Sequence, residues 1–321
     1  MNPPLVSILI PCHNAAPWIA ATLESAIAQT WTRKEIIVVD DGSSDNSAGI
    51  VHTYANRGVH LVTQENRGAA AARNHALRHA QGEFIQFLDA DDVLAPDKTE
   101  QQVRALGAAA GHIAAGPWGR FNDHPATAVF TPEANWHDSP PVEWLTFNFA
   151  GDGMMPPAAW LTPRSLVDTA GPWDERLTLN DDGEYFCRVL LASRGVIFCP
   201  NARSYYRSNL AGSLSQQRTD TAWRSAFLSH DLCAQHLLAH ENSPQTRRAC
   251  ADLFQRLAFA IYPDLPKLVR QCEAKAFSFG GSDQHPGGGR GFQIIARLLG
   301  WKLAQRLRVM ARRKTKKPHS P

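Results

Sequence analysis

The chain has 321 residues, of which 44% are hydrophobic and 20% are charged, and its formal net charge is +3. This length and apolar content are typical of a globular protein with one large domain, or with one domain and an appendage. The six cysteines show no C-x-x-C spacing, so neither a zinc site nor a disulfide framework is indicated, and a reducing compartment is expected. The first apolar stretch, residues 5–10, stops at Pro11 and is too short for a signal peptide or a membrane span.

Positive charge is concentrated at the C-terminal end of the chain. From Arg290 onward the sequence contains ten lysines and arginines and no acid, whereas the preceding 289 residues contain 23 basic and 30 acidic residues. A mildly acidic body with a basic tail predicts that the tail contacts an anionic surface, and charge alone allows phospholipid or nucleic acid.

Strand and helix patterns alternate in the first hundred residues. Short apolar stretches predict strands at residues 5–10, 35–39, 59–62 and 83–87, and helical patterns lie between them at 17–29, 47–55 and 69–80. This alternation is typical of a parallel sheet with right-handed crossovers, an architecture that often binds nucleotides. Neither a G-x-G-x-x-G after the first strand nor a G-x-x-x-x-G-K-[ST] is present, so dinucleotide oxidoreductases and P-loop enzymes are disfavoured.

Three carboxylates directly follow the fourth expected strand. Asp89, Asp91 and Asp92 come after the apolar stretch that ends at Phe87. Open α/β sheets bind ligands at the carboxyl ends of their strands, and Mg²⁺ or Mn²⁺ takes carboxylate oxygens together with substrate phosphates. The cluster therefore indicates a divalent metal and phosphate chemistry. The alternative is a solvated turn in which Asp92 caps the next helix.

Five segments occur in order along the first third of the chain. They are Val6–Pro11, Gln29–Trp31, Glu35–Ser43, Asn66–Asn74 and Phe87–Asp92. In sequence and separation they resemble glycosyltransferase family 2, the nucleotide-sugar-dependent transferases of GT-A fold. The resemblance implies an α/β fold of the GT-A type, a Rossmann-like mixed sheet flanked by helices, here with a helical C-terminal extension. It also implies a nucleotide-sugar donor and an inverting reaction.

Carried over residue by residue, the resemblance implies a nucleotide site. Asp41 would accept the uracil N3 proton, and Pro11 and His13 would line the base and ribose pocket. Arg73 would contact the base carbonyls or the phosphates through its planar donor fork. Without the resemblance, Asp41 reads as a turn cap and Arg73 as an exposed helical arginine. Asp45 is interpreted as the N-cap of the second helix.

The same resemblance assigns the triplet Asp89, Ala90 and Asp91 to the donor and its cation. Asp91 is the expected ligand of Mn²⁺ or Mg²⁺, and this cation neutralises charge on the departing nucleoside diphosphate. Asp89, beside Ala90 in the nucleotide-sugar site, is expected to bind the donor ribose or the sugar hydroxyls. Asp92 is interpreted either as a residue that supports a metal ligand or as a solvated side chain.

Transfer to an acceptor hydroxyl also requires a general base. The segment from residue 180 to residue 190 resembles the family's acid-Asp-x-acid helix start, and the resemblance places the base at Asp182. The alternative is a helix start enriched in acids that match the macrodipole, which accounts for Asp181 and Glu184 without chemistry. Gly183 stands where an aromatic residue is frequent in the family.

The end of the expected catalytic domain carries further candidates. Arg207 is interpreted either as a residue that reaches the donor phosphates or as a structural arginine at a sheet edge, and the segment 212–215 resembles a loop that closes over the donor. Trp160 and Trp173, with Asp174, fall in the acceptor half, where an aromatic face can stack on a sugar. Core packing is the alternative for each tryptophan.

A helical appendage is expected after the transferase domain. Residues 1–215 are assigned to the GT-A domain, 216–279 to a helical extension with helices at 219–240 and 244–261, 280–291 to a flexible Gly-rich linker, and 292–321 to a basic amphipathic tail. In the tail, apolar residues from Phe292 to Met310 recur at three- and four-residue spacing. Such a helix lies on an anionic membrane through residues 290–317, or packs on its own domain with a solvated basic face.

The expected function is transfer of one sugar, from a UDP-sugar, to a hydroxyl of a carbohydrate or lipid-linked acceptor in the synthesis of cell-surface polysaccharide, lipopolysaccharide or glycolipid. A processive synthase is disfavoured because the sequence has no Q-x-x-R-W motif. The alternatives are a nucleotide-sugar-binding protein without turnover and a nucleotidyltransferase that forms the activated sugar. We expect a cytoplasmic protein, peripheral at the inner face of the membrane, that binds no nucleic acid.

Overall fold

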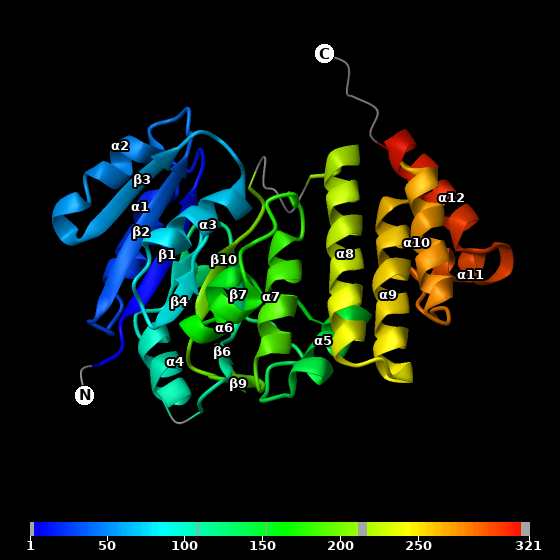
Figure 1. The fold of residues 1–321 in the computed structure, drawn as a ribbon. Coiled ribbons are helices and arrows are strands. Elements are labelled where there is room, and N and C mark those ends of the chain that lie inside the picture. Colours follow the sequence, from blue (N-terminus) through cyan, green and yellow to red (C-terminus); the bar gives the residue numbers. More distant parts are fainter. Residues whose placement is uncertain (1–2, 108, 152, 211–216, 316–321) are drawn as a thin grey trace, which may run out of the picture. The chain divides into compact units, whose positions relative to one another are not determined.

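The structure is a computed structural model that describes residues 3–107, 109–151, 153–210 and 217–315. The chain divides into two compact units (Figure 1). The first unit contains the residues up to Asn148 and those from 153 to Glu241, and the second contains residues 149–151 and those from Asn242 onward. The expected loop at 212–215 lies outside the described residues.

A five-stranded mixed sheet forms the centre of the first unit. Its order is β3 (Val59–Gln64), β2 (Lys34–Asp41), β1 (Val6–Cys12), β4 (Phe84–Phe87) and β8 (Thr162–Pro163). The first four strands are mutually parallel, with Ile8 of β1 beside Ile36 of β2 and Gln86 of β4, and β8 is antiparallel to β4. The four strands expected from the sequence are confirmed, each within two residues of its predicted bounds at both ends.

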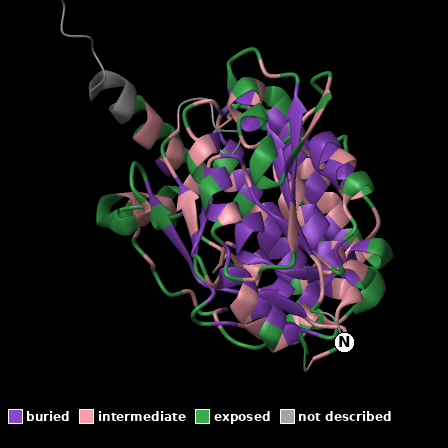
Figure 2. Cartoon of the chain, turned by 90° about the vertical axis from the view of Figure 1, so that its left-hand side faces the viewer, coloured by how far each residue is buried: buried purple, intermediate pink, exposed green. Residues whose placement is uncertain are grey.

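Helices cover both faces of this sheet. On one face α1 (Ile19–Ile27), α2 (Ser47–His52) and α4 (Lys98–Gly107) share a single core cluster of buried apolar residues with β1 and β2. α3 (Ala69–His79) also contacts β1 and β2, but its buried alanines are outside that cluster, which places it on the opposite face. Figure 2 shows the strands buried between helices whose outer sides are exposed.

Two smaller sheets and four further helices complete the first unit. One sheet has the order β5 (Val93–Leu94), β10 (Ser204–Arg207) and β7 (Trp118–Phe121), and the other pairs β6 (Ile113–Ala115) with β9 (Val196–Phe198). The helices are α5 (Pro141–Ala150), whose last two residues belong to the second unit, α6 (Arg164–Ala170), α7 (Asp181–Ala192) and α8 (Asp220–His240).

An aromatic cluster fills the core beside β4 and α7. Trp173 stacks on Tyr185 with ring centroids 4.0 Å apart, and Phe87 meets Trp173 edge to face at 5.0 Å. Trp160 stacks on Phe186 at 5.4 Å. Because Trp160 and Trp173 are each 1% exposed, core packing is their role, and neither presents a face to a sugar.

The first unit extends beyond the boundary expected at residue 215. α8 packs against α7, and Ser225 Oγ accepts hydrogen bonds from Thr178 N at 2.8 Å and Leu179 N at 3.0 Å. Ser229 Oγ accepts from Asn180 Nδ2 at 2.7 Å. These contacts tie α8 to the start of α7, so the compact unit that holds the sheets ends at Glu241.

The second unit is helical. It contains α9 (Pro244–Ile261), α10 (Pro266–Ser278), α11 (Arg290–Leu299) and α12 (Trp301–Thr315). The stretch between α10 and α11 is not a free linker, because Ser282 Oγ donates to Asp252 Oδ1 and Gln284 Nε2 to the carbonyl of Ala150. The amphipathic tail forms two helices, since Gly300 has a φ of +81° that ends α11. Within the described residues, no helix has the length and apolar character needed to cross a membrane.

Candidate active site

The carboxyl ends of β1, β2 and β4 lie at one edge of the central sheet, because these strands are parallel. His13 follows β1, Asp41 ends β2 and Asp89 follows β4. The structure therefore brings these residues to the same edge, as the sequence predicted. α3 and α7 contribute Arg73 and Asp182 to the same region.

Arg73 joins two acidic segments that are far apart in the sequence. Its Nη2 donates to Asp89 Oδ1 at 2.7 Å, and its Nη1 donates to Asp181 Oδ2 at 2.7 Å. The guanidinium lies 4.4 Å from the centroid of the Trp173 ring, and the side chain is 6% exposed. Burial lowers the pKa of Arg73, but Asp89 and Asp181 outweigh burial and hold this pKa above its ordinary value. Arg73 is thus a buried cation, and the reading as an exposed helical arginine is wrong.

Asp91 and Asp92 occupy different environments. Asp92 is 1% exposed, its Oδ1 accepts from Arg207 N at 2.9 Å, and its Oδ2 has no partner among the described residues. Burial, followed by the charges of Asp91 and Asp89, raises the pKa of Asp92 well above its ordinary value. The readings of Asp92 as a helix cap or a solvated side chain are therefore wrong. Asp91 is half-buried, and burial together with Asp89 raises its pKa to about 6.

Arg207 supports the loop that carries these acids. Its Nε donates to the carbonyl of Asp91 at 2.9 Å, its Nη1 donates to the carbonyl of Asn122 at 2.6 Å, and its guanidinium lies over the rings of Trp18 and Phe121. β10 is the central strand of its sheet, so Arg207 is not a sheet-edge arginine. Its guanidinium lies directly beside the main chain of Asp91.

The first turn of α7 presents the predicted base. Asp182 is half-buried, and its Oδ1 accepts from Gly183 N at 2.9 Å. Burial, followed by the charge of Asp181, outweighs the attraction of Arg73 and raises the pKa of Asp182 to about 7. A carboxyl that titrates near neutral pH is suited to accept a proton from a substrate hydroxyl.

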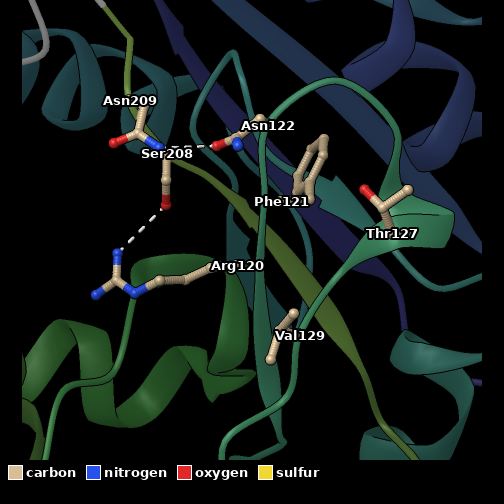
Figure 3. A pocket seen from close by; sticks show the side chains of 7 residues that line it. All are labelled: Arg120, Phe121, Asn122, Thr127, Val129, Ser208 and Asn209. Carbon is tan, nitrogen blue, oxygen red and sulfur yellow. Dashed lines mark hydrogen bonds between the residues drawn. The ribbon is translucent and has the colours of Figure 1, made fainter.

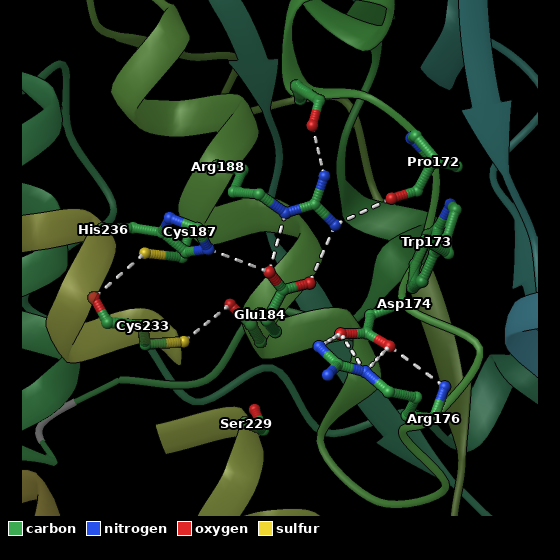
Figure 4. A network of polar contacts seen from close by, with 12 residues as sticks. Pro172, Trp173, Asp174, Arg176, Glu184, Cys187, Arg188, Ser229, Cys233 and His236 are labelled. Atoms are coloured by element: carbon green, nitrogen blue, oxygen red, sulfur yellow. Dashed lines mark hydrogen bonds and ion pairs between the residues drawn. The ribbon is translucent and has the colours of Figure 1, made fainter. Parts of the chain in front are cut away.

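Glu184 belongs to a different network, which Figure 4 shows. Arg188 donates to the two oxygens of Glu184 at 2.7 and 2.8 Å, and His236 Nε2 lies 3.3 Å from Oε1. Arg188 also donates to the carbonyl of Pro172 at 2.9 Å. Residues two apart on a helix do not share a face, so Glu184 points away from Asp182 and holds α7 to its neighbours.

Asp41 organises the segment that precedes α3. Its Oδ1 accepts from Gln64 Nε2 at 2.7 Å and from Arg67 N at 2.8 Å, and its Oδ2 accepts from Gly68 N at 2.8 Å. Asp41 is buried. An ionised carboxylate offers about four acceptor positions, so roughly one remains for a ligand.

The loops after β1 and β2 are bonded to each other. Asn14 Oδ1 accepts from Ser44 N at 2.8 Å, and His13 has Asn66 Nδ2 3.2 Å from its Nε2. Gly42 has a φ of +69°, and a Cβ there would lie 2.9 Å from Asn66 N. The close approach of the loop after β2 to the segment after β3 thus requires glycine at position 42.

Some structural partners in the site carried no signal in the sequence. Thr22 Oγ1 donates to the carbonyl of Ala90 at 2.9 Å and to that of Asp92 at 2.8 Å, which fixes the loop after β4. Asn74 bonds both the main-chain N–H and the carbonyl of Trp173.

Pro11 is a buried residue of β1. The residue before the second helix is Asn46, not Asp45, although Asp45 Oδ1 accepts from Ser47 N at 2.9 Å.

The acids after β4 fit a cation that shares its ligands with phosphate. In the described part of the chain, no three His, Cys, Asp or Glu residues form a cation-binding group. Mg²⁺ commonly binds one or two carboxylates and completes its shell with substrate phosphates and water, and Mn²⁺ also prefers carboxylate ligands. The charge of Asp89 helps to raise the pKa of Asp91, and a divalent cation bound at Asp91 would offset this repulsion. Asp91 therefore fits the role of a single protein ligand.

Comparison with known proteins identifies the family. Residues 7–160 match the family model described as glycosyl transferase family 2. The chain is 29% identical over 256 residues to the putative glycosyltransferase EpsH of Bacillus subtilis, a match that covers 77% of this chain and 73% of EpsH. Residues 7–160 thus carry the pattern of glycosyl transferase family 2, and the similarity to EpsH extends over most of the chain.

Other relatives match the N-terminal third of this chain. It is 43% identical over 107 residues to the UDP-Glc:alpha-D-GlcNAc-diphosphoundecaprenol beta-1,3-glucosyltransferase WfgD of Escherichia coli, covering 33% of this chain and 42% of WfgD. It is 43% identical over 106 residues to the putative teichuronic acid biosynthesis glycosyltransferase TuaG of Bacillus subtilis, covering 32% of this chain and 42% of TuaG. These two matches span less than half of each relative.

Solved structures confirm the GT-A fold expected for the family. S. aureus TarS 1-349, crystallised in complex with UDP-GlcNAc, superposes with a TM-score of 0.62 at 18% identity and covers 85% of this chain and 88% of that one. The mannosyltransferase PcManGT from Pyrobaculum calidifontis, in complex with GDP-Man and Mn²⁺, gives a TM-score of 0.56 at 20% identity and covers 97% of this chain and 84% of PcManGT. Together with the family match and the similarity to EpsH, these structures identify a glycosyltransferase of GT-A fold.

Proposed function

We propose that this glycosyltransferase moves a single sugar from a UDP-sugar to an acceptor hydroxyl with inversion at the anomeric carbon. The observation that carries the proposal is the position of Arg73, which pairs at 2.7 Å with Asp89 after β4 and with Asp181 at the start of α7. These pairs bring the donor triplet and the acid Asp182 into one site, where the charge of Asp89 contributes to the raised pKa of Asp182.

Asp182 is the proposed general base. It takes the proton of the acceptor hydroxyl while the hydroxyl oxygen attacks the anomeric carbon and the bond to the nucleoside diphosphate breaks. A single displacement of this kind inverts the configuration. Asp91 would hold Mn²⁺ or Mg²⁺, which supplies Lewis-acid stabilisation of the leaving diphosphate when bound. Asp89, with one oxygen bonded to Arg73, offers its other oxygen to donor hydroxyls.

Uracil is the proposed donor base. The remaining acceptor position of Asp41 is assigned to the uracil N3–H, with Pro11 and His13 lining the base and ribose site. Arg207, whose Nε and Nη1 bond main-chain carbonyls, is assigned to a donor phosphate through Nη2, which bonds none of the described residues. The UDP-GlcNAc complex of TarS and the UDP-Glc donor in the name of WfgD support this assignment. The GDP-Man complex of PcManGT makes a guanine donor the alternative to test.

A saccharide linked to a lipid diphosphate is the proposed acceptor class, in the synthesis of a cell-surface polysaccharide or glycolipid. The name of WfgD, which specifies a GlcNAc-diphosphoundecaprenol acceptor, supports the class. Such an acceptor lies at a membrane, so an enzyme that acts on it gains from a membrane-binding surface.

α11 and α12 of the second unit are proposed to provide that surface. α12 packs partly on its own unit, because Trp301 meets the rings of Phe259 and Tyr262 and Lys302 pairs with Glu273. The two helices nevertheless leave six large apolar side chains exposed, namely Ile294, Leu298, Leu299, Leu303, Leu307 and Met310. Both alternatives from the sequence thus have support, and the proposal is peripheral binding to anionic phospholipid at the cytoplasmic face.

A donor panel tests the proposal. UDP-, GDP- and dTDP-sugars are assayed for hydrolysis with Mn²⁺, with Mg²⁺ and with chelator, in the wild-type chain and in Asp91→Ala. We expect hydrolysis of a UDP-sugar that requires a divalent metal and Asp91. Metal-independent hydrolysis, or a preference for a GDP- or dTDP-sugar, would contradict the corresponding part of the proposal.

A further inference from the structure

A cavity of about 330 Å³ lies beside the candidate active site, between β7, the segment after it and the end of β10. Figure 3 shows Arg120 directed toward Ser208 and Asn209 directed toward Asn122. The lining residues are Arg120, Phe121, Asn122, Thr127, Val129, Ser208 and Asn209. The reaction proposed above assigns no role to this cavity.

The guanidinium of Arg120 is held in place without a paired acid. Its Cζ lies 4.8 Å from the ring centroid of Trp118 and 5.3 Å from that of Tyr206. Within the described residues, its side-chain hydrogen bonds are a long one of 3.3 Å to Ser208 Oγ and one of 3.4 Å to the weak acceptor Met154 Sδ. Among the described residues no carboxylate lies within 4 Å of its nitrogens. Burial raises the pKa of Glu133, whose Oε2 accepts from Met154 N, and the charge of Arg120 acts to lower that pKa. An arginine positioned by aromatic rings and lacking an ion-pair partner is available to an anion.

The other polar groups of the cavity are neutral. Ser208 and Thr127 contribute hydroxyls, and Asn122 and Asn209 contribute amides that bond each other at 3.0 Å. Among the described residues, no acid lines the cavity. One cation with several hydroxyl and amide donors and no carboxylate suits a phosphate, because the guanidinium fork binds two oxygens and neutral donors bind the rest.

The cavity adjoins the reacting groups through Arg207. Arg207 immediately precedes Ser208, and it bonds Asp92 through its N–H and the carbonyl of Asp91 through its Nε. Its Nη1 donates to the carbonyl of Asn122, which lines the cavity. A phosphate at Arg120 and a donor diphosphate at Asp91 would therefore lie on two sides of the same arginine.

We propose that this cavity binds a phosphate group of the acceptor, with Arg120 as the specificity-determining residue. The inference rests on the proposed function, because it assumes that the donor diphosphate occupies the Asp91 side. The phosphate belongs either to the diphosphate that links a saccharide to a lipid or to a phosphodiester of a polyol phosphate polymer. In both sources the acceptor hydroxyl lies at a fixed distance from a phosphate, so the cavity selects the acceptor and orients its hydroxyl.

The test is calorimetric binding of three probes to the full chain saturated with UDP and Mn²⁺. The probes are a short-chain alkyl diphosphate-linked N-acetylglucosamine, a glycerol phosphate oligomer and a phosphate-free alkyl N-acetylglucosaminide. We expect at least one phosphate probe to bind more tightly than the phosphate-free glycoside, and the tighter of the two identifies the source. Arg120→Gln should weaken binding of that probe about tenfold relative to any loss for the glycoside, since the variant lacks both the charge and the donor fork. Arg120→Lys should give an intermediate loss, because it keeps the charge without the fork.

Arg203→Gln is the matched control, because Arg203 is an exposed arginine over the ring of Phe130 and does not line the cavity. It should bind every probe as the wild type does. Three results in Arg120→Gln would overturn the proposal. They are equal weakening of all three probes, no weakening of any probe, and a parallel fall in UDP affinity. The last result would assign the cavity to the donor. If the wild type hydrolyses no donor, that result instead contradicts the proposed function. Binding of the phosphate probes is measured without hydrolysis, so the two failures can be distinguished.

Discussion

Arg73 Nη1 lies 2.7 Å from Asp181 Oδ2, although the two residues are 108 positions apart in the sequence. The same guanidinium bonds Asp89 Oδ1 at 2.7 Å, so one buried arginine fixes the separation between the acids after β4 and the helix that carries Asp182. Removal of the cation would leave two acids facing each other. The site then loses its geometry and gains repulsion at the same time.

The first prediction is that Arg73→Gln destabilises the fold by about 3 kcal/mol, the typical cost of leaving a buried charge without its partner. Donor hydrolysis should fall with stability, because Asp89 loses its position. Arg73→Lys should restore part of the stability and little activity, since an ammonium cannot span both carboxylates. Urea unfolding measures the free energy. Arg78→Gln, a change at an exposed residue of the same helix, should leave stability unchanged. An equal loss of stability in Arg78→Gln would show that the two ion pairs of Arg73 are not the cause.

The second prediction concerns the pH dependence of transfer. A base must be ionised to accept a proton, and burial with Asp181 raises the pKa of Asp182 to about 7. The value of kcat/KM should therefore rise with pH through about 7 and level off above it. Asp181→Asn removes the neighbouring charge, so the remaining activity should show this rise at lower pH. A pH profile of initial rates that spans both sides of neutrality measures both.

Asp182→Asn tests the base itself. Transfer should fall by about two orders of magnitude or more, while UDP affinity stays near the wild-type value, because the amide cannot accept the proton. Calorimetric titration with UDP supplies the second measurement. Retained turnover would shift the role to Asp181, since Glu184 is committed to Arg188 and His236.

The third prediction is that Asp91→Ala abolishes the metal dependence of UDP binding. The carboxylate of Asp91 is the proposed cation ligand, and the neighbouring Asp92 is buried against Arg207. Titration with UDP in the presence of Mn²⁺, and again with chelator, measures the effect. Asp168→Ala, an exposed acid of α6, should keep the wild-type difference between the two conditions. Unchanged affinity and metal dependence in Asp91→Ala would take Asp91 out of the site.

The fourth prediction compares two glycines with positive φ. Gly42 has a φ of +69° and a Cβ added there would meet Asn66 N at 2.9 Å, whereas Gly58 has a φ of +81° and open space around it. Gly58→Ala should cost about 1 kcal/mol from backbone strain alone. Gly42→Ala should cost more, and it should weaken UDP binding, because it pushes the Asn66 loop away from Asp41. Thermal unfolding with UDP titration distinguishes the two effects, and equal losses would argue against the steric contact.

Much of the secondary structure in the first hundred residues can be predicted from local sequence patterns. The strands and helices there alternate with apolar periods and turn residues that act over a few positions, and the structure confirms them. The acids at the strand ends were predictable for the same reason, since the carboxyl ends of parallel strands meet at one edge.

The remaining features depend on tertiary contacts that no local pattern contains. The pairing of Arg73 with Asp181 joins α3 to α7, and the burial that raises the pKa of Asp182 comes from surrounding elements. The cavity at Arg120 exists because β7 pairs with β10. The first compact unit extends past residue 215 because hydrogen bonds from residues 178–180 hold α8 in it, and these contacts have no signal in the local sequence.

The fifth prediction concerns the two terminal helices, which are proposed to bind anionic phospholipid. Each Lys or Arg near such a surface contributes about 1 kcal/mol, and salt screens this attraction, so pelleting with anionic vesicles should fall steeply as ionic strength rises. Exposed apolar side chains of α11 should leave a salt-resistant remainder. Sedimentation with anionic and with neutral vesicles measures both components.

Two changes separate charge from insertion. The double variant Leu298→Ser and Leu299→Ser removes two exposed leucines and keeps every basic residue, so it should lose the salt-resistant remainder and retain the salt-sensitive part. A chain that ends at Gly289 should lose both components while its donor hydrolysis persists. Because this truncation also uncovers the rings of Phe259 and Tyr262, on which Trp301 packs, the double variant is the cleaner comparison. Equal pelleting of the full and truncated chains would contradict membrane binding and favour helices whose contact is confined to their own unit.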